Sequence, residues 1–483
     1  MSTLFQQRLK RRTLLKQVGG LLAAPWIVPA GALGAGRQVP PSERVTVGLI
    51  GAGMMGRAHL RRMVNNPDAR ILAVCDVDQW RLKDAQGMVH AAYGAEQKGG
   101  TYKGCAAYAD FRELLARPDI DAVLIATGDR WHAVQTVMAA KAGKDIYCEK
   151  PISLTIHESR AMVDAVRRYD RVFQGGFQQR SVRDFQIAVQ LIHSGRLGRL
   201  KNIYCNWVGT SGLVNLPAEP VPDTLDWDMW VGPAAWHPFN SRFHRLGEPN
   251  RTVPWDFNRD FGGGSITSNG VHHLDIAQWA LGMDASGPVE IIAPRPGEAS
   301  TIVTYKYASG VTVQSFPHKL DPKVQDIPEG LDPTIRFQWE VLFVGEHGWI
   351  VAGRQGPLRA YPEAILADID VSGPADQVAP APAPAPPTPD GRTGATTARE
   401  LAEQLYRARG YTHHDNWIHS IRMRQQPISD VESAARATNV GHLANIATWT
   451  GRPQKWDPVR EAFVDDAEAN RMRQRAVREP WIL

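Results

Sequence analysis

Apolar and polar positions divide the chain after residue 43 into two regions with different periodicity. From 44 to 177, short β-branched apolar runs alternate with stretches of helical spacing. This alternation predicts a parallel, doubly wound Rossmann-type sheet with right-handed crossovers. The expected strands are 44–50, 71–76, 122–126, 145–148 and 172–177, and the expected helices end near 64, 116, 142 and 169.

The region 178–483 shows the opposite order, because strand patterns follow one another without helices between them. A helix is expected at 182–194, followed by strands at 200–208, 289–292, 301–307, 311–316 and 338–343. This order predicts an α+β domain with a large, mostly antiparallel sheet. Further helices are expected at 267–281, 397–409, near 419 and, exposed, at 465–478. The Pro/Ala-rich run 378–392 predicts an extended excursion.

The first 36 residues have the pattern of an export signal. A basic segment contains the adjacent pair Arg11 and Arg12, an apolar run follows at 18–28, and small residues come next. We therefore expect a twin-arginine signal peptide at 1–36 and a periplasmic protein. No later segment is long and apolar enough to predict a membrane span.

The formal net charge of +5 comes entirely from this segment, which holds five Lys and Arg and no Asp or Glu. The rest of the chain has no formal net charge, so nothing in it favours a nucleic-acid partner. Of the four cysteines, Cys75 and Cys148 are expected to be buried thiols in one sheet, whereas the pattern does not place Cys105 and Cys205. No Cys/His spacing indicates a metal site.

The first predicted strand leads directly into GAGMMG, a glycine-rich turn, and then into a helix. In a dinucleotide-binding unit, such glycines permit a tight turn, close approach of a pyrophosphate and close helix packing. Asp76 follows twenty residues after Gly56 and ends the second strand, where a carboxylate would accept hydrogen bonds from ribose hydroxyls. We therefore expect NAD rather than NADP, the alternative being a unit that binds nothing. The turn residues expected to contact NAD are Gly51, Gly53, Met54, Met55 and Gly56.

Lys150 stands at the carboxyl end of a predicted parallel strand, where ligands bind in doubly wound sheets. A lysine beside a nicotinamide can exchange a proton with a substrate hydroxyl. On the predicted helix 267–281, Ser268, His272 and Asp275 share one face. His272 is therefore a candidate acid or base, the alternative being a buried histidine bonded to backbone.

Four tryptophans, Trp227, Trp230, Trp236 and Trp255, cluster between two polar, Pro-rich stretches. Aromatic faces stack on sugar rings, which makes Trp227 and Trp230 candidate substrate contacts. The equally weighted alternative is that these rings anchor a long loop on the core.

Several motifs together resemble the Gfo/Idh/MocA oxidoreductases, especially an exported bacterial branch. They are GAGMMGRAH, AVCDVD, IATGDRWHA, KAGKDIYCEKP and GGGSITSNGVHHLDIAQWALG, with FQQRS and the C-terminal HHDNWIHSIR to EPWIL. The resemblance covers essentially everything after the signal. It implies a Rossmann domain followed by an α/β domain whose sheet carries the substrate site and an oligomer contact.

The resemblance also assigns roles to individual residues. It implies that Lys150 and His272 flank the substrate and that Glu149 and Pro151 shape the nicotinamide pocket. Thr127 and His132 of IATGDRWHA join the expected cofactor-binding residues. Two positions depart from the pattern: Ser268 stands where many members have Asp, and Gly128 replaces a proline after Thr127.

The expected function is an exported NAD-dependent oxidoreductase acting on CH–OH of a carbohydrate or polyol. An exported enzyme has no soluble NAD pool, so we expect tightly bound NAD that is recycled within the cycle. One alternative is a redox-neutral, NAD-dependent glycoside hydrolase or lyase. Another is a non-catalytic carbohydrate-binding protein, which the departure at Ser268 would permit.

Overall fold

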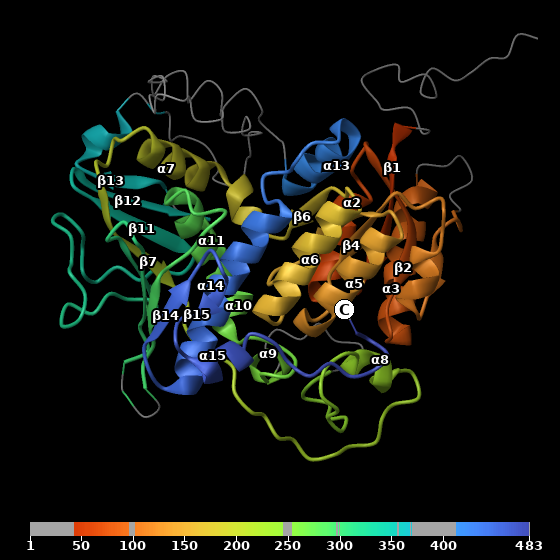
Figure 1. The fold of residues 1–483 in the computed structure, drawn as a ribbon. Coiled ribbons are helices and arrows are strands. Elements are labelled where there is room, and N and C mark those ends of the chain that lie inside the picture. Colours follow the sequence, from red (N-terminus) through yellow and green to blue (C-terminus); the bar gives the residue numbers. More distant parts are fainter. Residues whose placement is uncertain are drawn as a thin grey trace, which may run out of the picture. The chain divides into compact units, whose positions relative to one another are not determined.

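The computed structural model describes residues 43–95, 102–244, 254–295, 298, 300–354, 357–367, 369 and 412–482 (Figure 1). The expected signal at 1–36, the excursion at 378–392 and the helix at 397–409 lie outside these residues. No described helix is both long and apolar enough to cross a bilayer.

The first sheet has six strands, all parallel, in the order β3-β2-β1-β4-β5-β6. This confirms the predicted doubly wound sheet and adds β3, a short strand that the apolar pattern did not indicate. The strands are β1 (Val45–Ile50), β2 (Ala69–Cys75), β3 (Ala106–Tyr108), β4 (Ala122–Ile125), β5 (Asp145–Cys148) and β6 (Phe173–Gly175).

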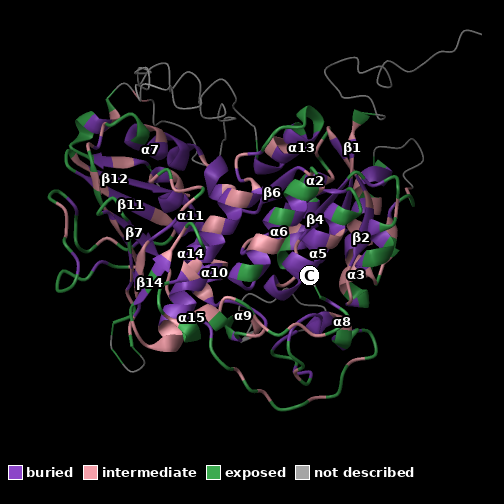
Figure 2. Cartoon of the chain, viewed as in Figure 1, coloured by how far each residue is buried: buried purple, intermediate pink, exposed green. Residues whose placement is uncertain are grey.

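Helices cover both faces of this sheet. Successive residues of a strand point to opposite faces, and here both sets are apolar and buried. On β1 and β4, Leu49 and Leu124 face one helical layer, whereas Ile50 and Ile125 face the other. Figure 2 shows these strands buried and the exposed positions gathered on outer helix surfaces such as that of α3. The helices that follow the strands are α2 (Met54–Met63), α3 (Gln79–Ala95), α4 (Phe111–Leu115), α5 (Asp129–Lys141) and α6 (Ile156–Arg168).

The second sheet has nine strands in the order β13-β12-β11-β7-β10-β9-β8-β14-β15. All its pairings are antiparallel except β7 with β10, which confirms the mostly antiparallel prediction. The strands are β7 (Leu200–Asn206), β8 (Glu290–Ile292), β9 (Val303–Lys306), β10 (Thr312–Phe316), β11 (Glu340–Gly345), β12 (Gly348–Gly353), β13 (Arg359–Tyr361), β14 (Gln454–Asp457) and β15 (Ala462–Phe463).

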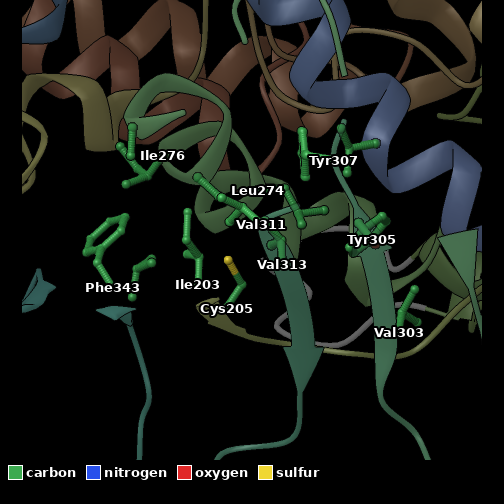
Figure 3. Close-up of a cluster of buried hydrophobic side chains, with 14 of the residues drawn as sticks. Ile203, Cys205, Leu274, Ile276, Val303, Tyr305, Tyr307, Val311, Val313 and Phe343 are labelled. Atoms are coloured by element: carbon green, nitrogen blue, oxygen red, sulfur yellow. The ribbon is translucent and has the colours of Figure 1, made fainter. Parts of the chain in front are cut away.

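One face of the nine-stranded sheet packs on helices, and this contact forms the largest apolar core. Figure 3 shows Leu274 and Ile276 among side chains from β7, β9, β10 and β11. On the opposite face, Leu320, Leu331 and Phe337 of the connection 317–339 cover part of the sheet. The helical elements of this region are η3 (Gln178–Ser181), α7 (Arg183–His193), α8 (Trp227–Val231), α9 (Pro254–Phe257), α10 (Ser265–Ser268), α11 (Gly270–Ala280) and η4 (Glu363–Leu366).

The chain returns to the first sheet near its C-terminus. Helix α13 (His413–Met423) contributes Trp417 and Ile418 to the core above β1, and α14 (Val431–Thr450) packs against both α6 and α11. Helix α14 therefore belongs to the cores of both sheets (Figure 1). At the end of the chain, Trp481 is buried against Trp131.

The prediction of an exposed helix at 465–478 is correct only for a short helix near its start. Helix α15 (Ala467–Arg471) ends early, and the following arginines bond to separate partners in other elements. Arg475 pairs with Glu158 at 2.8 Å, and Arg478 pairs with Asp228 at 2.5 Å. Residues 475–478 have no regular secondary structure, and each of the two arginines is held by its own partner.

Two helical glycines provide a matched test of packing. A Cβ at Gly56 would lie 1.9 Å from the Gly51 carbonyl oxygen, whereas a Cβ at Gly87 on α3 would meet nothing within 4 Å. We expect Gly56→Ala to lower the free energy of unfolding by roughly 1–3 kcal/mol. Gly87→Ala should raise it by about 0.5–1 kcal/mol, because an exposed helical glycine costs entropy. Guanidinium unfolding measures both, and equal effects would contradict the close approach at Gly56.

Candidate active site

The glycine-rich turn after β1 has the geometry of an anion cradle. Gly51 has φ +92°, which favours glycine, and its N–H donates to the Cys75 carbonyl at 2.9 Å. Gly53 is the N-cap of α2 and no side chain caps this helix, so its first N–H groups are left for a ligand. An added Cβ at Gly53 would meet only an Arg81 side-chain atom, at 3.7 Å. The turn therefore fits a dinucleotide pyrophosphate.

Asp76 follows β2 and holds the glycine-rich turn in place. Its two carboxylate oxygens accept from the Ala52 N–H at 2.7 Å and the Asp78 N–H at 2.9 Å. Each oxygen keeps a free lone pair, and Asp76 lines the adjacent groove. This placement fits an acceptor for ribose hydroxyls, which remains a prediction.

A groove runs over the glycine-rich turn and is closed by a segment from far along the chain. One wall comes from the first sheet and α5, and the other comes from residues 229–230, 243–244 and 255. Lys150 and His272 lie outside the groove lining. The lining residues are Ile50, Gly51, Gly53, Met54, Met55, Cys75, Asp76, Val77, Arg81, Ala109, Phe111, Ala126, Thr127, Gly128, Arg130, Trp131, Gln135, Met229, Trp230, Phe243, His244 and Trp255.

Buried polar contacts fix the second wall, which we call the roof (Met229, Trp230, Phe243, His244 and Trp255). His244 Nε2 lies 3.0 Å from an Asp78 carboxylate oxygen, and both side chains are buried. Arg130 donates to the Trp230 carbonyl at 2.6 Å, and Trp131 Nε1 donates to the Met229 carbonyl at 2.9 Å. The sequence analysis missed these contacts, although the tryptophan cluster marked the segment.

Trp227 and Trp230 lie in the core of this segment. Their rings stack at 4.4 Å, Trp227 Nε1 donates to the His237 carbonyl and Trp230 Nε1 donates to His244. Trp230 also reaches the groove, on the side of the glycine-rich turn. The structure supports the loop-anchor alternative and brings neither ring to Lys150.

Glu149 is a buried carboxylate that gathers groups from distant parts of the chain. His59 Nε2 and Gln178 Nε2 lie 2.8 Å and 2.6 Å from Glu149 Oε1, and the Lys150 N–H donates to Oε2 at 3.1 Å. Burial alone would raise the Glu149 pKa, but the His59 hydrogen bond and nearby positive charge outweigh it and lower the pKa to about 2. His59 also bonds to His414 of α13 at 2.8 Å. The sequence indicated Glu149 and Lys150 but not His59, Gln178 or His414.

His132 lies behind the groove and connects two turns. Its Nδ1 lies 2.7 Å from the Pro151 carbonyl and its Nε2 lies 3.1 Å from the Thr127 carbonyl. Burial lowers the His132 pKa, which favours the neutral ring. With both nitrogens facing backbone, His132 positions the turns, whereas Thr127 lines the groove itself.

Lys150 interrupts the helix that the sequence predicted at 267–281. Its Nζ donates to the Ser268 carbonyl at 2.5 Å, and the Lys150–Pro151 peptide is cis. The His272 N–H, which would otherwise bond to that carbonyl, bonds to the Asn269 carbonyl at 3.2 Å instead. The predicted helix is therefore two helices, α10 and α11, and Lys150 lies at the break.

His272 is the third residue of α11 and lies near Lys150, and its surroundings favour the neutral imidazole. Burial, followed by the charges of Arg354 and Lys150, lowers its pKa well below the usual value. Its Nδ1 has no hydrogen-bond partner in the described part of the chain. Asp275 does not orient His272, because both of its oxygens accept from Arg180. His272 therefore offers an unengaged nitrogen to a ligand.

Two further carboxyls, which sequence analysis missed, lie close to Lys150. Burial raises the pKa of Asp129, and the neighbouring charge of Asp256 raises it further. Burial also raises the pKa of Asp256, which lies beside Ser268 and Lys150. Asp129 Oδ2 and Asp256 Oδ1 lack partners among the described residues. These two aspartates therefore bring carboxyl groups close to Ser268, the position at which many family members carry an aspartate.

Comparison with known proteins connects this geometry to a family. Residues 45–177 match the model described as "Oxidoreductase family, NAD-binding Rossmann fold". Residues 197–324 and 401–483 match "Oxidoreductase family, C-terminal alpha/beta domain". Together these ranges include the glycine-rich turn, Lys150 and His272.

Curated relatives match over part of their length. A myo-inositol 2-dehydrogenase of Thermotoga maritima is 30% identical over 153 residues, which is 32% of this chain and 42% of the relative. A levoglucosan dehydrogenase of Pseudarthrobacter phenanthrenivorans is 28% identical over 245 residues, 50% of this chain and 52% of the relative. The chain thus spans about half the length of these relatives.

Solved structures share the fold over a longer span. An aldose-aldose oxidoreductase from Caulobacter crescentus has 20% identity and a TM-score of 0.50, and the match covers 85% of this chain and 99% of that chain. At this identity the likeness concerns the fold alone. With both family models matched in order over most of the described residues, the chain belongs to the Gfo/Idh/MocA oxidoreductase family.

Proposed function

We propose that the protein is an NAD-dependent oxidoreductase that acts on CH–OH of a carbohydrate or polyol and keeps its dinucleotide bound through the cycle. The observation that carries the proposal is the roofed groove over the glycine-rich turn. Its roof is held by the buried His244–Asp78 pair and by two donors from α5. A dinucleotide in this groove would lie against a wall that these buried contacts hold in place, so we expect its exchange to be slow.

The substrate class comes from the relatives and from the side chains around Lys150. The names of the two curated relatives refer to inositol and levoglucosan. Oxidised nicotinamide, when bound, would accept a hydride from the substrate carbon. Lys150 Nζ, held by the Ser268 carbonyl, would take the hydroxyl proton, and neutral His272 would hydrogen-bond the same hydroxyl.

We propose NAD rather than NADP because of the carboxylate beside the glycine-rich turn. Asp76 is fixed by two backbone donors and keeps lone pairs on the groove side. It would accept bonds from both adenosine ribose hydroxyls and repel a 2′-phosphate.

A redox-neutral glycoside hydrolase or lyase is the second candidate, and retention of the dinucleotide favours it equally. Release of an aglycone from an aryl glycoside without free NADH would identify it. Oxidation of a sugar with reduction of a second substrate would support the first candidate. Binding without any turnover would indicate a carbohydrate-binding protein.

We also propose a homo-oligomer formed through the nine-stranded sheet. The connection 317–339 covers the part of the outer face over β11 and β12. The remaining part carries polar side chains such as Thr304 and Lys306. Such a surface suits a hydrated, polar contact between copies.

Retention of the dinucleotide is tested with two histidines of the same segment. Each pairs with an aspartate, His244 with Asp78 at the groove and His237 with Asp260 away from it. We expect purified wild type and His237→Ala to carry NAD(H) by mass spectrometry. His244→Ala should lose it at least about tenfold faster on dialysis, because breaking a buried pair loosens the roof. Wild-type protein that is empty and needs millimolar NAD would overturn the proposal.

The role of Lys150 is tested by separating turnover from binding. Lys150→Ala should lower kcat at least about a hundredfold while the dinucleotide stays bound, because general acid–base groups contribute roughly 10²–10⁴-fold. Lys141→Ala, at the exposed end of α5, is the control. Oxidised sugars and aryl glycosides serve as the substrate screen, and unchanged kcat in Lys150→Ala would remove it from the reaction.

Export through the twin-arginine pathway is proposed from residues 1–36 alone. Changing Arg11→Lys and Arg12→Lys together should trap the precursor in the cytoplasm, because the pair is read as an address rather than as charge. Arg8→Lys should leave export unchanged. Cell fractionation measures both, and normal export of the double variant would refute the assignment.

A further inference from the structure

A cluster at the ends of β7, β10 and β12 and the start of β11 has no role in the chemistry proposed above. It consists of Trp207, His318, Trp339 and Arg354, and we call it the aromatic–arginine cluster. The Trp207 and Trp339 rings lie 4.9 Å apart, His318 lies 5.5 Å from Trp207, and the Arg354 guanidinium stands 4.7 Å over Trp339. None of the four lines the dinucleotide groove.

The backbone at this cluster is strained. Trp207 has φ +93° and His318 has φ +34°, conformations that a side chain bearing a Cβ rarely adopts. The two residues come from separate connections, yet their rings are in contact. Strained non-glycine residues persist where surrounding structure holds them, and they gather at ligand sites.

The cluster adjoins the residues proposed for proton transfer. With the Gln179 amide oriented to donate to the His272 carbonyl at 2.9 Å, its oxygen accepts from Arg354 Nε at 3.2 Å. A Cβ on Gly270, two residues before His272, would lie 3.5 Å from Trp207 Cβ. Arg354 and Trp207 therefore both lie near the start of α11, and both contact Trp339.

Two donors of the cluster are unused, and so is one ring nitrogen of the neighbouring His272. Arg354 Nη2, Trp207 Nε1 and His272 Nδ1 have no hydrogen-bond partner among the described residues. No carboxylate in the described part of the chain forms an ion pair with Arg354. Burial lowers the Arg354 pKa to about 10, and the charge of Glu149 opposes this only in part. The guanidinium remains a cation, so a ligand anion would compensate it.

We propose that the substrate is a sugar or polyol carrying an anionic group, which Arg354 binds while the sugar ring packs on Trp207 and Trp339. The inference rests on the proposed function and names its substrate class. A planar guanidinium matches a carboxylate with two parallel hydrogen bonds and also binds phosphate. Anchoring that group at Arg354 places a neighbouring CH–OH carbon beside His272 and Lys150.

Binding to the dinucleotide-loaded protein tests the charge requirement with matched ligands. The neutral members are glucose, galactose and myo-inositol, and the anionic members are glucuronate, gluconate, galacturonate and glucose 6-phosphate. Calorimetry should give at least one anionic ligand a Kd at least about tenfold below that of its neutral counterpart, the gain typical of a charge-assisted hydrogen bond. Carboxylates and the phosphate form separate arms, which distinguish the two sources of the anion.

Variants of Arg354 test whether this side chain causes the preference for anionic over neutral ligands. Arg354→Met keeps the length of the side chain and should bring anionic and neutral ligands to equal affinity. Arg354→Lys keeps the charge without the planar fork and should keep a reduced preference. Arg199→Met, at an exposed arginine paired with Glu346, is the control and should keep the full preference.

Three results would overturn the proposal. They are equal or tighter binding of neutral ligands by wild type, an unchanged preference in Arg354→Met, and no binding of any anionic ligand. Dinucleotide retention and the Lys150→Ala result are measured separately, so the proposed function can stand if this inference fails. Calorimetry measures binding whether or not the ligand is turned over. Thermal unfolding confirms that each variant is folded.

Discussion

The buried negative charge of Glu149 is the constraint around which this site is organised. An unpaired carboxylate in a protein interior costs several kcal/mol, so the fold must bring donors to it. His59 comes from α2, Gln178 from the start of the second region, and His414 reaches His59 from α13. Because Lys150 is the next residue, satisfying Glu149 also fixes where the Lys150 side chain begins. The two regions of the chain are thus joined at the residue beside the proposed chemistry.

Lys150 has acidic side chains on one side and a basic side chain on the other. Asp129 and Asp256 lie on one side with raised pKa values, because burial disfavours their charged forms. Arg354 lies on the side of His272, and its charge helps to keep that imidazole neutral. A ligand between the two sides would meet carboxyls whose neutral form burial favours at one end and a cation at the other.

Features that depend on local sequence pattern were predicted from the sequence, whereas features that depend on contacts between distant residues were not. The glycine-rich turn, Asp76 and Lys150 follow from strand ends and spacing, and the structure places them as expected at the edge of one sheet. The split of the predicted helix 267–281 could not be read from periodicity, because Lys150, more than a hundred residues earlier, takes the Ser268 carbonyl. The polar contacts that hold the roof and the position of Arg354 could not be predicted for the same reason, since each depends on a distant part of the chain.

The four cysteines are all unpaired and buried, and they are distributed over both sheets. Burial raises the thiol pKa of Cys75, Cys105, Cys148 and Cys205, so little reactive thiolate forms in the folded protein. An oxidising compartment would therefore leave these four thiols unchanged while the chain stays folded. The rate at which each thiol reacts with a labelling reagent would report how often the structure around it opens. Cys205 would report on the nine-stranded sheet independently of Cys75 and Cys148 in the six-stranded one.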